Sequence, residues 1–280
     1  MAEDGRLLHP ASTRTGNLEA GFDPSVTYRI ALGVEADLRS RLVRVLQAWP
    51  DITIGVLKNP SDAEEEAPTE SVLGWDVLAV DHLAEVYFPR IHEAAENGIP
   101  VVVGAHLPAR FSAPNSPFVC NASTGGGLAA ALARYVSPGD DPYLETRLAW
   151  TVAGRPLRAG QAVTFPEPVG PLWAGRHPTD GTKATCYVAP TDSGWGAVRV
   201  DLMVGDGNGG RRMVLGISDH HDYLKAAGFG AAIMAAAKGT YSAGLSRGPG
   251  DSKGVFMEIA QEAGLRVARF HPEDEPQTWV

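Results

Sequence analysis

The sequence predicts an α/β fold: a parallel sheet with helices on both faces, followed by a second α+β domain whose sheet is mostly antiparallel. Between residues 27 and 136, short apolar runs alternate with helical patterns, which is typical of parallel strands joined by helices. After residue 138 the apolar runs are separated by turns, which favours antiparallel pairing. A chain of 280 residues with 44% hydrophobic content is long enough to bury a core in two such domains.

The first domain is expected to alternate strands and helices. Its strands are short apolar runs: Tyr28–Gly33, Ile52–Leu57, Asp76–Val80, Ile99–Val103 and Phe118–Cys120. Its helices have apolar or alanine residues at helical spacing: Glu35–Ala48, Leu83–Asn97 and Gly126–Tyr135. Pro89 is expected to kink or shorten the second helix, and Gly98 to end it. The acidic residues at positions 60–70 predict an exposed loop.

The second domain is expected to hold strands at Leu144–Ala153, Ala184–Val188, Ala197–Val204 and Arg212–Ile217, with the glycine-rich residues 206–210 joining the last two as a hairpin. Two helices, Leu224–Lys238 and Val255–Ala263, and a strand, Leu265–Phe270, follow. The predicted organisation is an extension over 1–24, a first domain over 25–138, a substrate-binding or dimerisation domain over 139–249, and a return to the first domain over 250–280.

Composition excludes several classes of partner. A net charge of −9 argues against nucleic acid or an anionic membrane, since both need clustered lysine and arginine. Two cysteines, Cys120 and Cys186, fit buried thiols in a reducing compartment. No apolar run has the length of a membrane span, and the polar, acidic start is not a signal peptide. We therefore expect a cytoplasmic protein.

Three polar or glycine-rich segments follow expected strands. Asp81-His82 follows the third strand, Gly104-Ala105-His106 follows the fourth, and Asn121-x-Ser123-x-Gly125 opens the alanine-rich helix. Ligands of open parallel sheets bind at the carboxyl ends of the strands, where these segments lie. The helix start at Asn121, Ser123, Thr124 and Gly125 could hold the carboxylate or phosphate of a substrate, and Ser123 or Thr124 could also cap the helix.

In this order, the segments over residues 27–136 resemble the N-terminal domain of dihydrodipicolinate reductase. Residues 165–170 and the small-residue helix near 226–239 resemble saccharopine-dehydrogenase-type proteins. Both are oxidoreductase families with a Rossmann-like domain. The resemblance implies NAD or NADP, a substrate with a C=N or C–N bond, and a homo-oligomer. It implies cofactor contacts at the strand ends: Gly33, Val34, Asp81, His82, Gly104 and His106.

The glycine-rich turn of these families is altered here. A Gly-x-Gly-x-x-Gly turn is expected after the first strand, but Gly33 is followed by Glu35 and Asp37. These carboxylates would face the phosphates of a dinucleotide, while acids in a first helical turn also stabilise an ordinary helix. The second strand is followed by Lys58 instead of an acid, which could favour the 2′-phosphate of NADP or be a surface charge.

A second candidate segment is Asp219-His220-His221-Asp222-Tyr223-Leu224-Lys225. Dihydrodipicolinate reductases use His-His-x-x-Lys, so the spacing here is one residue longer. Histidine can transfer a proton near neutral pH, and lysine can pair with a substrate carboxylate. Alternatively, Asp219 caps a turn, one histidine packs under the sheet and the other is solvated. No metal site is predicted, because adjacent residues on a strand point in opposite directions.

The leading hypothesis is an NAD(P)-linked oxidoreductase acting on a small carboxylated substrate. In it, His220 or His221 supplies a proton, and Lys225 with residues 121–125 holds the substrate. The first alternative is a non-redox cyclase, lyase or isomerase on the same scaffold, without a dinucleotide. The second is a non-catalytic binding protein, which would have unperturbed histidines and no closed pocket.

Overall fold

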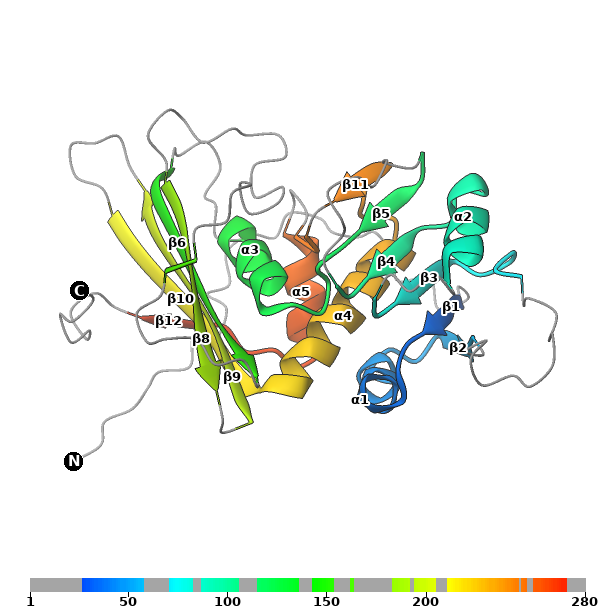
Figure 1. The fold of residues 1–280 in the computed structure, drawn as a ribbon, viewed down its shortest axis with the longest axis horizontal. Helices are drawn as coiled ribbons and strands as arrows, with labels where there is room; N and C mark the ends of the chain where they lie inside the picture. The colour runs from blue at the N-terminus through cyan, green and yellow to red at the C-terminus, as the bar shows by residue number, and fades with distance from the viewer. Residues whose placement is uncertain are drawn as a thin grey trace.

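The structure is a computed structural model that describes residues 27–57, 71–82, 87–105, 115–135, 143–153, 162–163, 183–191, 194–204, 211–246, 248–250 and 254–270. In this part of the chain, two six-stranded sheets flank a central group of helices (Figure 1). The first is a Rossmann-like parallel sheet and the second is mostly antiparallel, which confirms the predicted fold class. The expected extension over 1–24 lies outside the described residues.

The first sheet contains β1 (Tyr28–Gly33), β2 (Ile52–Val56), β3 (Val77–Val80), β4 (Val101–Val103), β5 (Pro117–Val119) and β11 (Gly244–Ser246). Their order is β11-β5-β4-β3-β1-β2, and every pair is parallel. The chain leaves β1 toward β2 on one side and returns to β3 on the other. The strand order therefore reverses between β1 and β3, which is where ligands of open α/β sheets bind.

Helices cover both faces of this sheet. On one face, α1 (Ala36–Leu46) packs against α4 (His221–Ala237), and Val45 lies directly against Gly230 of α4. On the other face lies α2 (Phe88–Glu96), which contributes Ile91 to a second apolar cluster. Pro89 occupies the first turn of α2, where a missing N–H breaks no helical hydrogen bond. Pro89 therefore sits at the start of α2 and produces no internal kink.

The second sheet contains β6 (Tyr143–Ala153), β7 (Ala162–Val163), β8 (Lys183–Thr191), β9 (Trp195–Val204), β10 (Arg211–His220) and β12 (Ala268–Phe270). Their order is β12-β10-β9-β6-β8-β7, and β6 and β8 form its parallel pair. Val204 pairs with Arg211, which confirms the predicted hairpin, although its turn lies outside the described residues.

The chain returns to the first sheet earlier than expected. The returning strand is β11, which pairs with β5, whereas β12 pairs with β10 in the second sheet. The expectation that the strand ending at Phe270 joins the first domain was therefore wrong. The physical reason lies at Gly216 of β10, where the absent side chain leaves room for the ring of Phe270. The other domain boundaries stay a prediction.

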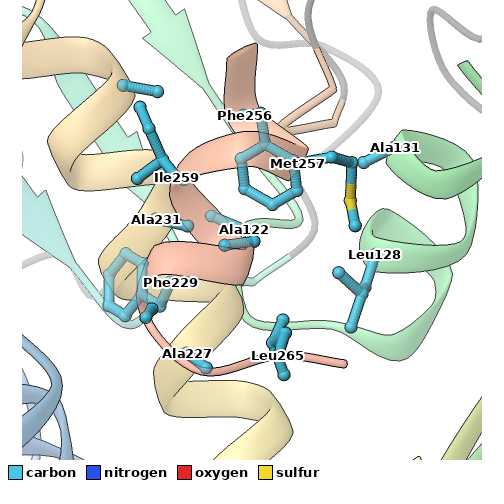
Figure 2. Close-up of a cluster of buried hydrophobic side chains, with 14 of the residues drawn as sticks. Ala122, Leu128, Ala131, Ala227, Phe229, Ala231, Phe256, Met257, Ile259 and Leu265 are labelled. Carbon is cyan, nitrogen blue, oxygen red and sulfur yellow. The ribbon is translucent and has the colours of Figure 1, made fainter. Parts of the chain in front are cut away.

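One hydrophobic core joins the two sheets. Helices α3 (Gly125–Tyr135), α4 and α5 (Val255–Glu262) lie between them (Figure 1). Figure 2 shows Phe229 of α4, Phe256 and Ile259 of α5 and Leu128 of α3 in this layer, all buried. The same core contains Leu32 of the first sheet and apolar side chains of the second sheet. The helices between the sheets are therefore packed on both sides.

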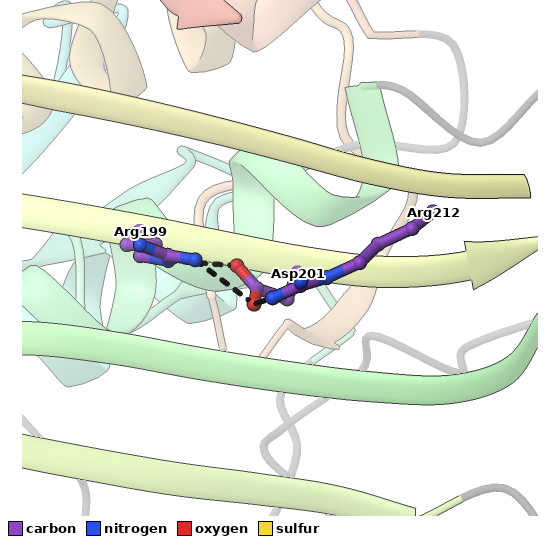
Figure 3. Close-up of polar contacts among 3 residues, drawn as sticks. All are labelled: Arg199, Asp201 and Arg212. Atoms are coloured by element: carbon purple, nitrogen blue, oxygen red, sulfur yellow. Dashed lines mark hydrogen bonds and ion pairs between the residues drawn. The ribbon is translucent and has the colours of Figure 1, made fainter. Parts of the chain in front are cut away.

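The face of the second sheet that lies away from this core carries polar side chains. Val198, Val200 and Leu202 of β9 are buried, and the alternate residues Arg199 and Asp201 lie on the opposite face. Asp201 accepts two hydrogen bonds from Arg199, at 2.8 and 3.1 Å, and one from Arg212 of β10 at 2.7 Å (Figure 3). This cluster links two neighbouring strands by charge-assisted hydrogen bonds.

Two further expectations concern burial and membrane spans. Cys120 is buried, as predicted, and its Sγ accepts a hydrogen bond from the Asn121 side-chain amide at 3.8 Å. Among the described residues, no helix combines the length and apolarity needed to cross a membrane.

Candidate functional site

A small pocket lies between the start of α3, the start of α4 and two strands of the second sheet. It is lined by Ser123, Thr124, Gly125, Leu128, Thr151, Ala197, Val198, His221, Leu224 and Lys225. About 260 Å³ of empty space, part of it open to solvent, lies within this lining, and its enclosed part has room for about one water molecule. The pocket brings together five residues that the sequence assigned to substrate binding or catalysis, from two segments about a hundred residues apart: Ser123, Thr124, Gly125, His221 and Lys225.

His221 is the first residue of α4, and it is half-buried. Its backbone N–H donates to the Gly194 carbonyl at 2.8 Å, and its Nδ1 lies beside Gly196, where a side chain would not fit. Burial lowers the pKa of His221 below its usual value, the charge of Lys225 lowers it further, and Asp222 partly opposes the shift. At neutral pH the imidazole is therefore uncharged and can accept a proton.

Lys225 lies one helical turn after His221 on the same face of α4. Both residues line the pocket, and the ammonium group of Lys225 is the positive charge that disfavours a protonated His221. A carboxylate bound beside Lys225 would compensate this charge. Substrate binding and protonation of His221 would therefore favour each other.

The first turn of α3 forms the facing wall. The Thr124 hydroxyl donates to the Asn121 carbonyl at 3.0 Å and accepts from the Gly127 N–H at 2.9 Å, so Thr124 caps the helix. Ser123 lines the pocket without a hydrogen bond from its hydroxyl to any described residue. Of the two residues that could cap α3, the structure therefore assigns capping to Thr124 and leaves the Ser123 hydroxyl available to a ligand.

The glycines of α3 allow close packing. A side chain at Gly127 would lie 2.0 Å from the Asn121 carbonyl oxygen, and one at Gly125 would meet the Trp150 indole at 2.9 Å. Asn121 itself has a positive φ of 58°, which asparagine tolerates, and it does not line the pocket. Trp150 is buried against Gly125, a contact that nothing local to β6 predicts.

The side chain of His220 lies outside the pocket, although His220 directly precedes His221 in the sequence. His220 ends β10, is exposed, and stacks on the exposed Trp195 with ring centroids 4.6 Å apart. Of the two histidines that the sequence offered as alternative proton donors, the structure therefore places only His221 among the pocket-lining residues.

A second polar cluster lies at the reversal point between β1 and β3. Asp81, whose side chain is 9% exposed, accepts a hydrogen bond from the Glu35 N–H at 2.7 Å through Oδ2. Its Oδ1 accepts from the His82 N–H at 2.8 Å and lies 2.6 Å from His82 Nδ1. Glu35 precedes α1, so a carboxylate of the protein lies at the N-terminal end of that helix.

The remaining cofactor-assigned residues pack around this cluster. The ring of Tyr87 lies against Gly33, where an added Cβ would be 2.7 Å from the ring, and Val34 is buried. Burial raises the pKa of Tyr87, and the charge of Asp81 raises it further. Gly104 fits between the Asp81 backbone and Ser123 Oγ, so the cluster adjoins the pocket wall. Lys58 and His106 lie outside the described residues.

The residues at this reversal point do not fit a dinucleotide as they stand. The N–H that would bind a pyrophosphate is already bonded to Asp81, and Tyr87 covers Gly33. Within the described ranges, the donor atoms of Glu35, Asp81 and His82 form a group that could hold a metal ion, all within 4.8 Å of one another. Both Asp81 oxygens already accept hydrogen bonds inside this group.

No protein-family model and no curated protein matches this chain. Among solved structures it is similar to a myo-inositol dehydrogenase from Corynebacterium glutamicum, with 12% identity over 88% of this chain and all of that one, at a TM-score of 0.43. It is also similar to GenD2 of gentamicin A biosynthesis, solved with NAD. That match has 11% identity, covers 88% of this chain and 97% of GenD2, and has a TM-score of 0.42. A third similar structure is an aspartate semialdehyde dehydrogenase from Candida albicans, solved with NADP. That match has 14% identity, covers 66% of this chain and 73% of the dehydrogenase, and has a TM-score of 0.37.

Proposed function

We propose that the protein is an enzyme that transfers a proton on a small carboxylated molecule bound in the His221 pocket. The observation that carries this proposal is the placement of an uncharged, half-buried histidine and a lysine one turn apart on α4, opposite the first turn of α3. The pocket thus combines a proton acceptor with a cation for the carboxylate.

The residues have distinct roles in this reaction. Lys225 pairs with the substrate carboxylate, and the Ser123 hydroxyl donates a hydrogen bond to it or to a neighbouring oxygen. Nδ1 of His221 lies against Gly196, so Nε2 is the nitrogen that exchanges the proton. His221 takes a proton from the atom next to the carboxylate and returns it at another position, which is the chemistry of an isomerase or of the first step of a lyase or cyclase.

A hydride-transferring enzyme would use the same proton carrier and carboxylate anchor. The Rossmann-like sheet and the adjacency of Gly104 to Ser123 support this second candidate, an NAD(P)-linked oxidoreductase of a C=N or C–N bond. The packing of Asp81 and Tyr87 at the start of α1 argues against it. Titration of the protein with NADH and NADPH, followed by calorimetry and nicotinamide fluorescence, separates the candidates.

Proton transfer can be tested before the substrate is known. A panel of small hydroxy, oxo, amino and imino acids is incubated with the protein in D₂O, and incorporation of deuterium at carbon is followed by NMR. We expect exchange in at least one compound, loss of exchange in His221→Gln, and unchanged exchange in His92→Gln. His92 is an exposed histidine of α2, paired with Glu96 far from the pocket. Equal exchange in His221→Gln would contradict the proposal.

A non-catalytic binding protein would give a different pattern. It would bind a carboxylate in a Lys225-dependent manner and show no exchange with any compound of the panel. The lowered pKa of His221 supports the enzyme, because an uncharged imidazole beside the lysine can accept a proton at neutral pH.

A further inference from the structure

We propose that Asp81 is a built-in substitute for the anion that the reversal point of the first sheet would otherwise bind. The start of α1 is then occupied by a carboxylate of the same chain, and a dinucleotide is excluded from it. This inference is independent of the reaction proposed for His221.

The first support is the position of the carboxylate. Oδ2 of Asp81 lies 2.7 Å from the Glu35 backbone nitrogen, which is the distance of a charge-assisted hydrogen bond. The N–H groups and the dipole at a helix start are what bind phosphate in nucleotide-binding folds. Asp81 meets the same two requirements, a negative charge and acceptor oxygens, at the same place.

The second support is that the carboxylate is held from its other side. Oδ1 accepts from the His82 N–H and lies 2.6 Å from His82 Nδ1, and the side chain is 9% exposed. Rotating Asp81 away from α1 would therefore break its contacts with both Glu35 and His82. A free anion would have to replace all of these contacts.

The third support is steric and electrostatic. Tyr87, which is 5% exposed, covers Gly33 where a pyrophosphate would approach the backbone. Glu35 and Asp37 add two exposed carboxylates next to the same helix start. Each of these features opposes a bound phosphate. A carboxylate oxygen of Glu35 also lies within 4.8 Å of the Asp81 carboxylate, and Asp81 is held against this repulsion by its contacts with the Glu35 N–H and with His82.

The experiment measures anion binding by thermal unfolding and calorimetry, with inorganic phosphate, ADP, NADH and NADPH as separate probes at constant ionic strength. Wild type is expected to bind none of them at millimolar concentration. Asp81→Ala exposes the Glu35 N–H and is expected to gain phosphate or ADP binding, with a melting temperature that rises by about 2–4 °C on saturation.

Asp76→Ala is the matched control. Asp76 accepts a hydrogen bond from the Arg29 backbone N–H at 2.7 Å, also between β1 and β3, but at the end of the strands away from α1. It should gain no anion response. If Asp81→Ala does not fold, Asp81→Asn keeps the shape without the charge and should show a smaller gain.

Two results would overturn the inference. Micromolar binding of NADH or NADPH by wild type would show that Asp81 does not close the site. An Asp81→Ala or Asp81→Asn protein that folds and responds to phosphate no more than Asp76→Ala would show that Asp81 does not replace an anion. Neither readout depends on His221, so the two proposals can fail separately.

Discussion

Two helix starts follow strands of the same parallel sheet, and they differ in what lies in front of them. At α1 the preceding backbone N–H is bonded to the Asp81 carboxylate, and Tyr87 covers the turn. At α3 the capping group is the short hydroxyl of Thr124, and the space beyond it is the His221 pocket. At α1 the capping carboxylate comes from Asp81, which follows another strand, and it occupies the space in front of the helix. At α3 the capping hydroxyl comes from Thr124, next to the helix, and the space in front stays accessible.

The strongest test of the accessible helix start, at α3, is Gly127→Ala. An added methyl group would lie 2.0 Å from the Asn121 carbonyl oxygen, so the turn that places Ser123 and Thr124 must shift. We expect a loss of about 3 kcal/mol in the free energy of unfolding, which outweighs the gain of up to ~1 kcal/mol in helix propensity. Urea unfolding measures it, with Gly248→Ala, which meets no atom within 4 Å, as the control.

The corresponding test of the closed helix start, at α1, is Asp81→Asn. Because the neutral amide loses the charge that interacts with the start of α1, we expect a loss of about 1–2 kcal/mol in unfolding free energy. Asp76→Asn, whose hydrogen bond has the same length but no helix behind it, should lose less. Equal losses, measured by urea unfolding of both variants, would show that the helix start gains nothing from Asp81.

Stability against pH distinguishes the pocket from the rest of the fold. Because the pKa of His221 is lowered in the folded state, the unfolded chain binds more protons between the folded pKa and the ordinary value near 6.5. The stability contribution of the neutral imidazole is therefore present above the unfolded pKa and lost as the pH falls toward the folded one. Unfolding of His221→Gln should show a weaker decline over this pH range than wild type.

The smallest expected effect concerns the charge inside the pocket. Lys225→Met removes the second cause of the lowered pKa and leaves burial, the first cause, in place. The pKa of His221, followed by NMR of the imidazole protons, should rise but stay below the ordinary value. A pKa that does not move would show that the ammonium group of Lys225 does not act on His221.

Sequence patterns predicted the alternating elements well because they depend on local periodicity. The strands β1 to β5 and the helices between them follow apolar runs that any neighbouring layer would bury. The strand β11 was missed because three residues, Gly-Leu-Ser, carry no strand pattern, and it exists through its pairing with β5. The position of β12 depended in the same way on a tertiary contact, that of Phe270 with Gly216.

The site was partly predictable for the same reason. Residue types suited to proton transfer and carboxylate binding singled out His221, Lys225 and Ser123, and the structure places all three around one pocket. The separation of His220 from this pocket follows from the exact residue at which β10 ends and α4 begins. The bond from Glu35 to Asp81 joins segments 46 residues apart, and no local pattern announces it.

The contact of Asp81 with α1 can also be described as tethering. A free anion reaches a helix start in proportion to its concentration, whereas a side chain fixed by the fold is present there at an effective concentration that ligands in solution do not reach. The occupancy of this helix start is therefore set by folding and does not follow the supply of any metabolite. Substitution of Asp81 would convert a constant part of the fold into a concentration-dependent binding equilibrium.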